Sequence, residues 1–202
     1  MSTSSNRVLL IFIKNPQKGN VKTRLATDLG DEEALHIYQK LLDYTRRLTL
    51  EVTADRILWY SRYIQLNDGW DESSFIKKKQ RGETLGQRMK YAFAYVFEED
   101  YKKAVIIGSD CGQLKPGHVE EAYQDLDSND VVIGPSRDGG YYLLGMNRLL
   151  PGLFDEKPWS TDAVLQQTID DCKEQGYSVH LLDELNDVDT KADWQQVKGQ
   201  FE

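Results

Sequence analysis

A basic loop follows the first apolar run of the chain and carries the residue types that bind phosphate. The run Val8–Ile13 leads into Lys14, Lys22 and Arg24, after which a helical pattern begins. A loop between a buried strand and a helix offers free backbone N–H groups and the positive end of the helix dipole, and Lys or Arg adds charge. The first 27 residues hold five cations and no acid, whereas the whole chain has 25 Lys and Arg against 33 Asp and Glu. This segment predicts binding of a phosphorylated small molecule.

A carboxylate stands at the end of a second apolar run. Val105–Ile107 is followed by Gly108, Ser109 and Asp110. Mg²⁺ and Mn²⁺ prefer carboxylate oxygens and leave coordination positions for phosphate and water, so Asp110 is a candidate metal ligand. An Asp at a strand end is more often a cap for the following loop, and the pattern alone leaves both interpretations open.

Two further acids, Asp187 and Asp189, precede the last helical segment. They are two residues apart, so in an extended chain they face the same side, and a second metal ligand is one reason for their presence. A solvated acidic turn is the alternative, because the helix dipole favours acids at a helix N-terminus. Thr190 and Asp193 form a capping-box pattern, which accounts for that pair structurally.

A turn sequence, Asp138 with Gly139 and Gly140, leads into the aromatic pair Tyr141 and Tyr142. Glycine lets the backbone approach a ligand closely. Asp138 is therefore a candidate general base or acceptor of hydrogen bonds from hydroxyl groups, and a Tyr ring is a candidate stacking surface. The same Asp-Gly-Gly sequence is equally typical of a simple hairpin turn.

The remaining potential ligands form weaker patterns. Gln80 and Gly82 stand at a strand-to-helix junction, where contact with a base or a ribose is one interpretation. His36, His118 and His180 lack the spacing of metal ligands and are interpreted as surface or packing residues.

Short β-branched and aromatic runs alternate with helical periodicity along the chain. Strand-like runs cover 8–13, 56–60, 104–107, 131–134, 141–144 and 177–182, and helical patterns cover 32–48, 85–97, 116–126, 161–174 and 190–198. Residues 67–79 are expected to form a loop that enters a short edge strand. This alternation predicts a mostly parallel, three-layer α/β structure with its site at the carboxyl ends of the strands. The length predicts one domain over residues 1–202.

Composition excludes several classes of protein. A net charge of −8 and a sequence pI near 5.0 argue against a nucleic-acid partner, which needs many cations on one face. The chain has two cysteines, Cys111 and Cys172, and its polar start is unlike a secretory signal, so a cytoplasmic location is expected. No apolar run approaches the roughly 20 residues that span a bilayer, so no membrane span is expected.

Several motifs occur in a specific order along nearly the whole chain. They are Lys14-x-Pro16-x-x-Gly19-x-x-Lys22-Thr23-Arg24-Leu25, Gln80-x-Gly82 with Leu85-Gly86-x-Arg88-Met89, Gly108-Ser109-Asp110-Cys111, Gly134-Pro135-x-x-Asp138-Gly139-Gly140-Tyr141-Tyr142, Trp159-Ser160-Thr161 and Asp187-x-Asp189-Thr190. This combination resembles a bacterial family of glycosyltransferase-A-fold proteins, labelled selenodomain-associated transferases and related to molybdenum-cofactor guanylyltransferase and phospholactate guanylyltransferase.

The resemblance implies a Rossmann-like nucleotide-diphospho-sugar transferase (glycosyltransferase-A) fold with three α/β/α layers and a mixed, mostly parallel sheet. Together with the residue patterns, it leads us to expect four groups of site residues. They are nucleotide or phosphate contacts at Lys14, Lys22, Arg24, Gln80 and Gly82, acceptor contacts at Gly139, Gly140, Tyr141, Trp159 and Thr161, Mg²⁺ or Mn²⁺ ligands at Asp110, Asp187 and Asp189, and catalytic roles for Asp110 and Asp138.

Two departures from the family pattern bear on activity. Gly112 stands where the family usually has Pro, which is expected to loosen the loop after Asp110. The glycine-rich nucleotidyltransferase signature ending in Arg-x-Gly-x-x-Lys is also absent, which favours transfer of a sugar over transfer of a nucleotidyl group.

The sequence therefore predicts a metal-dependent transferase that binds a nucleotide or nucleotide-sugar donor and acts on an unidentified small-molecule acceptor. Glycosyl transfer is the first expectation. The alternatives are a guanylyl- or cytidylyl-type nucleotidyltransferase that releases pyrophosphate, and a catalytically silent nucleotide-binding module.

Overall fold

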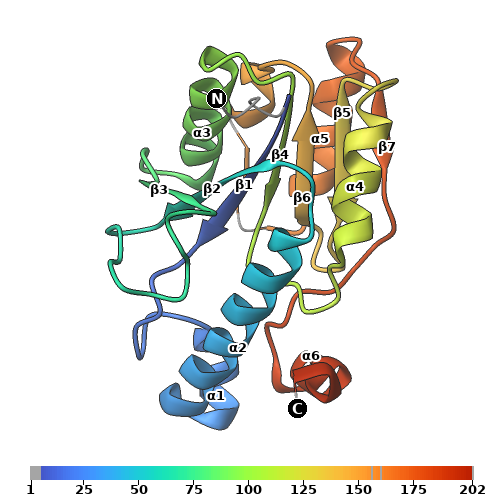
Figure 1. The fold of residues 1–202 in the computed structure, drawn as a ribbon. Coiled ribbons are helices and arrows are strands. Elements are labelled where there is room, and N and C mark those ends of the chain that lie inside the picture. The colour runs from blue at the N-terminus through green and yellow to red at the C-terminus, as the bar shows by residue number, and fades with distance from the viewer. Residues whose placement is uncertain (1–5, 156, 160, 202) are drawn as a thin grey trace.

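The computed structural model describes residues 6–155, 157–159 and 161–201. The polar start of the chain and Ser160 of the Trp159-Ser160-Thr161 motif lie outside the described residues. Figure 1 shows one twisted sheet with helices packed on both faces and a further group of helices beneath one edge. Within the part of the chain that is described, no helix is long and apolar enough to cross a membrane.

Seven strands form the sheet, in the order β3-β2-β1-β4-β6-β5-β7. Their bounds are β1 Arg7–Ile13, β2 Asp55–Tyr60, β3 Ile76–Lys79, β4 Lys103–Ile107, β5 Val131–Pro135, β6 Tyr141–Met146 and β7 Val179–Leu181. Strand β6 runs antiparallel to both of its neighbours, and the other pairs are parallel. The predicted mixed, mostly parallel sheet is confirmed, and β3 is the short edge strand expected at the end of residues 67–79.

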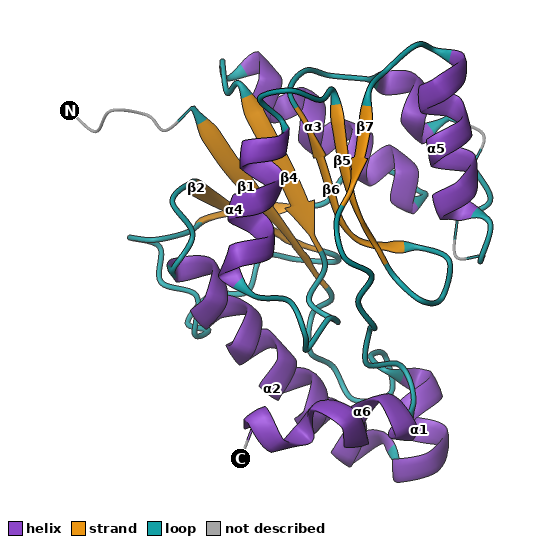
Figure 2. Cartoon of the chain, turned by 90° about the vertical axis from the view of Figure 1, so that its right-hand side faces the viewer, coloured by secondary structure: helices purple, strands orange, loops and turns teal. Residues whose placement is uncertain are grey.

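Helices cover both faces of this sheet (Figure 2). The helices are α1 Thr23–Leu29, α2 Asp31–Leu50, α3 Leu85–Glu98, α4 Pro116–Asp125, α5 Val164–Glu174 and α6 Lys191–Val197, with 3₁₀ turns η1 Pro151–Phe154 and η2 Lys198–Phe201. One core cluster packs α2 and α4 on one face, and a second packs α3, η1 and α5 on the other. The three-layer prediction is therefore confirmed.

The central strand β1 is buried on both faces, which is why its sequence is a continuous apolar run. Leu9 and Ile11 join the cluster beneath α2, while Val8 and Leu10 join the cluster beneath α3. Each of these side chains is fully buried, and burying one such side chain contributes about 1.5–3 kcal/mol. The carboxyl end of β1, where the basic loop begins, is thereby fixed in the interior of the sheet, beside the middle strand β4.

A third cluster lies under the carboxyl edge and joins α1, the first part of α2, and α6 (Figure 1). Leu25 of α1 packs here with Val188 and Trp194 from the C-terminal segment. Gly30 separates α1 from α2 with a positive φ of 82°, a conformation that glycine adopts without strain. The periodicity of residues 32–48 predicted α2 but not α1 as a separate helix. This cluster carries the basic loop and the acidic C-terminal segment toward each other.

Candidate functional site

A cavity of about 560 Å³ opens at the carboxyl edge of the sheet. Its walls come from the loop after β1, the start of α3, the end of β4, the β5–β6 turn, the segment before α5 and the segment before α6. The lining residues are Lys14, Asn20, Lys22, Thr23, Arg24, Tyr38, Leu85, Asp110, Asp138, Gly140, Tyr141, Trp159, Thr161, Asp162, Val164, Asp187 and Asp189. Most of the site residues predicted from the sequence are thus brought together, although they come from distant parts of the chain.

Lys22 forms the electrostatic centre of the cavity. Its ammonium lies 3.0 Å from Asp110 Oδ1 and 3.3 Å from Asp189 Oδ1, and only 4% of its side chain is exposed. Its backbone is left-handed, with φ 48° and ψ 45°, which is uncommon for a residue other than glycine. Burial opposes the charged form, but the carboxylates of Asp110, Asp189 and Asp187 outweigh it and raise the pKa of Lys22. The lysine is therefore a buried cation held between acids.

Asp187 is the third carboxylate of this group. Burial, reinforced by the neighbouring charge of Asp110, raises the pKa of Asp187 to about 7. The loop that carries it is tied to the end of β4, because Val188 N donates to Asp110 O at 2.9 Å. A carboxyl whose pKa is shifted by burial and by a neighbouring charge inside a cavity is a candidate functional residue.

The loop after β1 is attached to the strand beside it through one buried hydroxyl. Tyr38 of α2 accepts a hydrogen bond from Lys14 N at 2.9 Å and donates to Lys14 O at 3.0 Å, and its oxygen lies 3.1 Å from Ser109 Oγ. Tyr38 lies within the helical pattern of residues 32–48, and the sequence analysis did not identify it as a site residue. The contact fixes the basic loop relative to Asp110.

The predicted turn at Asp138 is a hairpin between β5 and β6 that also lines the cavity. Asp138 Oδ1 accepts a hydrogen bond from Gly140 N at 3.1 Å. Gly139 has φ 84°, and a Cβ on it would lie 2.2 Å from Asp162 O, so a larger residue cannot occupy this position without displacing the opposite segment. Leu165 N donates to Gly139 O at 2.9 Å. Both interpretations of the turn, structural and functional, are compatible with this arrangement.

Trp159 lies against the first turn of α3. A Cβ on Gly86 would meet Trp159 Nε1 at 2.4 Å, so the indole occupies the space that a side chain at this position would need. Leu85, with 44% of its surface exposed, lines the cavity beside it. Helix α5 begins at Val164 rather than at the expected residue 161, which leaves Thr161 and Asp162 in the cavity wall.

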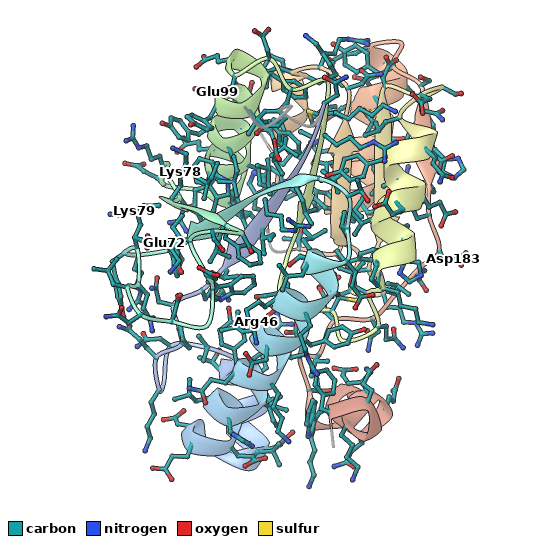
Figure 3. All side chains as sticks on the ribbon, viewed as in Figure 1. Arg46, Glu72, Lys78, Lys79, Glu99 and Asp183 are labelled. Atoms are coloured by element: carbon teal, nitrogen blue, oxygen red, sulfur yellow. The ribbon has the colours of Figure 1, made fainter. Side chains whose placement is uncertain are left out.

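Gln80 and Gly82, which the sequence analysis assigned to nucleotide contacts, do not line this cavity. Gln80 is buried, and its Nε2 donates to Ile13 O at 3.3 Å and to Trp59 O at 3.0 Å. It therefore ties together the ends of β1 and β2. Both residues border a second hollow of about 620 Å³ with Ser61, Arg62, Lys79, Arg81 and Arg88. Lys79 projects from the β3 edge of the sheet (Figure 3).

The loop after Asp110 is fixed rather than loose, which corrects the expectation drawn from Gly112. Gln200 Nε2 donates to Gly112 O at 2.6 Å, and Gln113 Oε1 accepts from Asn186 N at 2.9 Å. A Cβ on Gly112 would lie 3.3 Å from Val197, so the glycine allows α6 to pack closely. Cys111 is buried, and burial raises the pKa of its thiol to about 12.

The three acids predicted as metal ligands stand further apart than a preformed three-ligand site requires. Among the described residues, the one group of three His, Cys, Asp or Glu side chains with ligand atoms within 4.8 Å of one another is Glu121, Asp125 and His180, on α4 and β7. His180 Nε2 lies 3.3 Å from Asp125 Oδ2. The sequence did not indicate this proximity, because α4 and β7 are distant in the chain and are brought together only by the folding of the sheet.

Solved structures identify the fold class. A protein from Desulfovibrio desulfuricans G20, provisionally described as a nucleotide-diphospho-sugar transferase, is 32% identical and matches with a TM-score of 0.85 over 92% of this chain and 83% of its own. Rv0371c from Mycobacterium tuberculosis H37Rv, in complex with manganese, is 17% identical with a TM-score of 0.53 over 96% of this chain and 98% of its own, a likeness that shows the fold alone. The chain has the α/β fold of the nucleotide-diphospho-sugar transferases, as the sequence predicted.

Residues 44–161 match the family DUF2064, described as "Uncharacterized protein conserved in bacteria", and the chain belongs to this family. The 2-phospho-L-lactate guanylyltransferase of Methanocaldococcus jannaschii is 30% identical over 129 residues, which are 62% of this chain and 54% of that protein. The chain thus matches about half the length of its curated relatives. The predicted relationship to phospholactate guanylyltransferase is confirmed.

Proposed function

We propose that this protein is a nucleotidyltransferase, which transfers the nucleotidyl group of a nucleoside triphosphate to a small-molecule acceptor and releases pyrophosphate. The observation that carries the proposal is a single cavity in which a basic loop, three carboxylates and a wall containing Asp138 meet. The guanylyltransferase relatives favour this reaction over the glycosyl transfer that the sequence first suggested.

The donor end of the cavity is formed by the loop after β1. Lys14 and Arg24 border the cavity with exposed side chains, and 73% of the Arg24 side chain is accessible. Cations placed here stabilise the charge that develops on the departing pyrophosphate, which lowers the barrier when it grows in the transition state. The sequence analysis attributed the positive charge of this loop to its Lys and Arg side chains and to a helix dipole. Because helix α1 has only seven residues, the side chains contribute most of that charge.

The pair Asp110 and Asp189 is suited to hold a divalent cation. The ammonium of Lys22 already lies as a cation between Asp110 and Asp189, and carboxylate oxygens are the donors that Mg²⁺ and Mn²⁺ prefer. Asp110 and Asp189, with Asp187 beside them, would hold the ion, whose charge would polarise the donor phosphate. With such an ion held by these carboxylates, the Lys22 ammonium would be able to bind a phosphate oxygen.

Asp138 is suited to activate the acceptor. The hydrogen bond from Gly140 N orients one carboxylate oxygen, and the residue is exposed and lines the cavity. In the proposed step the acceptor oxygen bonds to the α-phosphorus, its proton passes to Asp138, and the bond from the α-phosphorus to the bridging oxygen breaks.

Identification of the leaving group tests the proposal. The full chain is incubated with Mn²⁺, a small-molecule acceptor panel and either a nucleoside triphosphate or a nucleotide sugar. Pyrophosphate is the expected product. Free nucleoside diphosphate from the sugar donor would instead indicate glycosyl transfer, and binding without breakdown of either donor would indicate a silent module.

Asp138→Asn is expected to keep nucleotide affinity and to lower single-turnover transfer by about 10²–10⁴-fold, the usual contribution of a general base. Asp183→Asn is the matched control, because this exposed acid lies at the edge of the molecule, outside the cavity lining (Figure 3). Wild-type transfer by the Asp138 variant would make Asp138 a turn residue only.

A further inference from the structure

The two ends of the site differ in charge. The hollow beside the donor end has four cationic residues and no acid among its lining residues, namely Arg62, Lys79, Arg81 and Arg88. It adjoins the main cavity, because Arg62 donates to Asn20 Oδ1 at 3.1 Å and Asn20 lines that cavity. Anionic groups of a nucleotide are therefore favoured on this side of the molecule.

One wall of the main cavity has the reverse character. It is formed by Asp138 and Asp162 with Leu85, Trp159 and Val164, and among the described residues that line this wall none is Lys or Arg. Both carboxylates are on exposed residues, so each keeps hydrogen-bonding capacity toward a bound molecule.

The cations nearest to this wall in sequence are engaged elsewhere. Lys157 has a fully buried side chain whose ammonium pairs with Asp171 of α5. Arg137 lies 3.6 Å from Glu184, and neither cation lines the cavity. The cations that do line the cavity, Lys14, Lys22 and Arg24, belong to the loop after β1. A phosphate or carboxylate placed against the wall itself would meet two like charges, an arrangement that complementary sites avoid.

The apolar part of the wall is held in place. Trp159 fills the space left by Gly86, and the backbone of Asp162 fills the space left by Gly139. A rigid indole beside Leu85 offers a flat apolar surface, and the two carboxylates accept hydrogen bonds from hydroxyl or ammonium groups.

We infer that the acceptor is an uncharged polyhydroxyl compound or an amine with an apolar face, and not a phosphorylated acid. This inference rests on the proposed function, and it separates this chain from its guanylyltransferase relatives, whose named substrate carries both a phosphate and a carboxylate. An acceptor hydroxyl then attacks the α-phosphorus and passes its proton to Asp138, with pyrophosphate as the leaving group.

Matched probes of one carbon skeleton test the inference. Glucosamine, glucose and glucose 6-phosphate share a ring and differ in charge, and 2-phospholactate represents the substrate type of the relatives. Each is titrated calorimetrically into the full chain saturated with nucleotide and Mn²⁺, and into the nucleotide-free chain. Glucosamine or glucose is expected to bind at least about tenfold more tightly than either phosphorylated compound, a factor equivalent to about 1.4 kcal/mol.

A charge reversal on the wall makes the result specific. Asp162→Lys is expected to bind glucose 6-phosphate more tightly than glucose, which inverts the order of affinities expected for the wild type. Asp170→Lys makes the same charge change on the exposed side of α5, outside the cavity, and is expected to keep the wild-type order. Equal or tighter binding of the phosphorylated compounds by the wild-type chain, or an unchanged preference in Asp162→Lys, would overturn the inference.

Failure of the proposed function is distinguishable from failure of this inference. Absence of nucleotide binding and of pyrophosphate release with every triphosphate would remove the proposed reaction. The sugar titration with the nucleotide-free chain still decides the charge preference of the wall, because it requires no turnover.

Discussion

At the scale of single residues, Lys22 decides the electrostatics of the site. Its ammonium neutralises carboxylates that come from the loop after β4 and from the C-terminal segment. Lys22→Met keeps much of the side-chain volume, leaves Asp110 without its cation and leaves Asp189 with the exposed Arg24 alone. We expect the free energy of unfolding to fall by about 2 kcal/mol, less than the roughly 3–5 kcal/mol for a fully buried pair, because both acids keep 35% of their side-chain surface exposed.

Urea denaturation with and without MnCl₂ measures this effect. Mn²⁺ is expected to restore part of the lost stability in Lys22→Met, since a divalent cation can take the place of the ammonium between the carboxylates. Lys18→Met is the control, because Lys18 pairs with the exposed Glu32, and its loss should leave the unfolding curve unchanged. An unfolding midpoint of wild-type value in Lys22→Met would show that the acids do not need Lys22.

At the scale of elements, two glycines at equivalent helix positions give opposite predictions. Gly86 and Gly117 are each the second residue of a helix, α3 and α4 respectively. A Cβ at Gly86 would strike Trp159, whereas a Cβ at Gly117 meets nothing within 4 Å. Gly86→Ala should destabilise the protein by about 1–3 kcal/mol through overpacking, and Gly117→Ala should stabilise it by up to about 1 kcal/mol through helix propensity.

Urea denaturation separates the two alanine variants, and tryptophan fluorescence reports whether Trp159 moves in Gly86→Ala. A shifted emission spectrum with weakened binding at the wall formed by Leu85 and Trp159 is expected. Equal stability of the two variants would mean that Trp159 is not held by α3.

The edge strand β7 depends on an acid at the start of β5. Asp130 Oδ2 accepts hydrogen bonds from Ser178 N at 3.0 Å and from Ser178 Oγ at 3.1 Å. The backbone N–H of Ser178, with help from Arg148, lowers the pKa of Asp130 below its ordinary value near 3.8. A lowered pKa in the folded state stabilises the protein at pH above 3.8, and this stability is lost as the pH falls through the folded-state value.

Asp130→Asn should therefore lower the free energy of unfolding by about 1–2 kcal/mol at pH 7, and the difference from the wild type should shrink below about pH 4. Chemical denaturation at pH 7 and at pH 3 provides the comparison. Asp100→Asn is the control, because its side chain is 97% exposed. A difference that stays constant with pH would assign the effect to packing rather than to charge.

At the scale of the whole molecule, an acidic protein must bind an anionic ligand. The chain has a net charge of −8, and the acids Asp110, Asp187 and Asp189 line the same cavity as the basic loop. Nucleoside diphosphate binding should therefore depend on Mg²⁺ or Mn²⁺, because the carboxylates otherwise repel it. With Mn²⁺ and ligand at 100 times its dissociation constant, the free energy of unfolding should rise by about 2.7 kcal/mol.

Calorimetric titration of GDP in MnCl₂ and in EDTA tests this dependence, and thermal unfolding under the same conditions gives an independent measurement. Chelation is expected to weaken binding markedly. Equal affinity in both conditions would remove the metal, and the metal-ligand roles of Asp110, Asp187 and Asp189, from the proposed function.

The local pattern of the sequence predicted most of the fold. Continuous apolar runs gave β1 and β4 because central parallel strands are buried on both faces, and periodic stripes gave α2 and α3. The Thr190 and Asp193 capping box is present at the start of α6. These features depend on neighbours in the chain, so their energetics can be read from sequence.

What the sequence determined by itself was which residue types stand at strand ends, and hence that cations, acids and a glycine turn would share one edge of a sheet. Only the tertiary structure decided that Lys22 lies between Asp110 and Asp189, across a separation of 167 positions from the second acid, and that Gln80 ties two strands instead of facing the cavity. The physical reason is that a charge pair or a buried amide is favoured only where burial removes competing water, and burial at one point is set by elements that are remote in sequence.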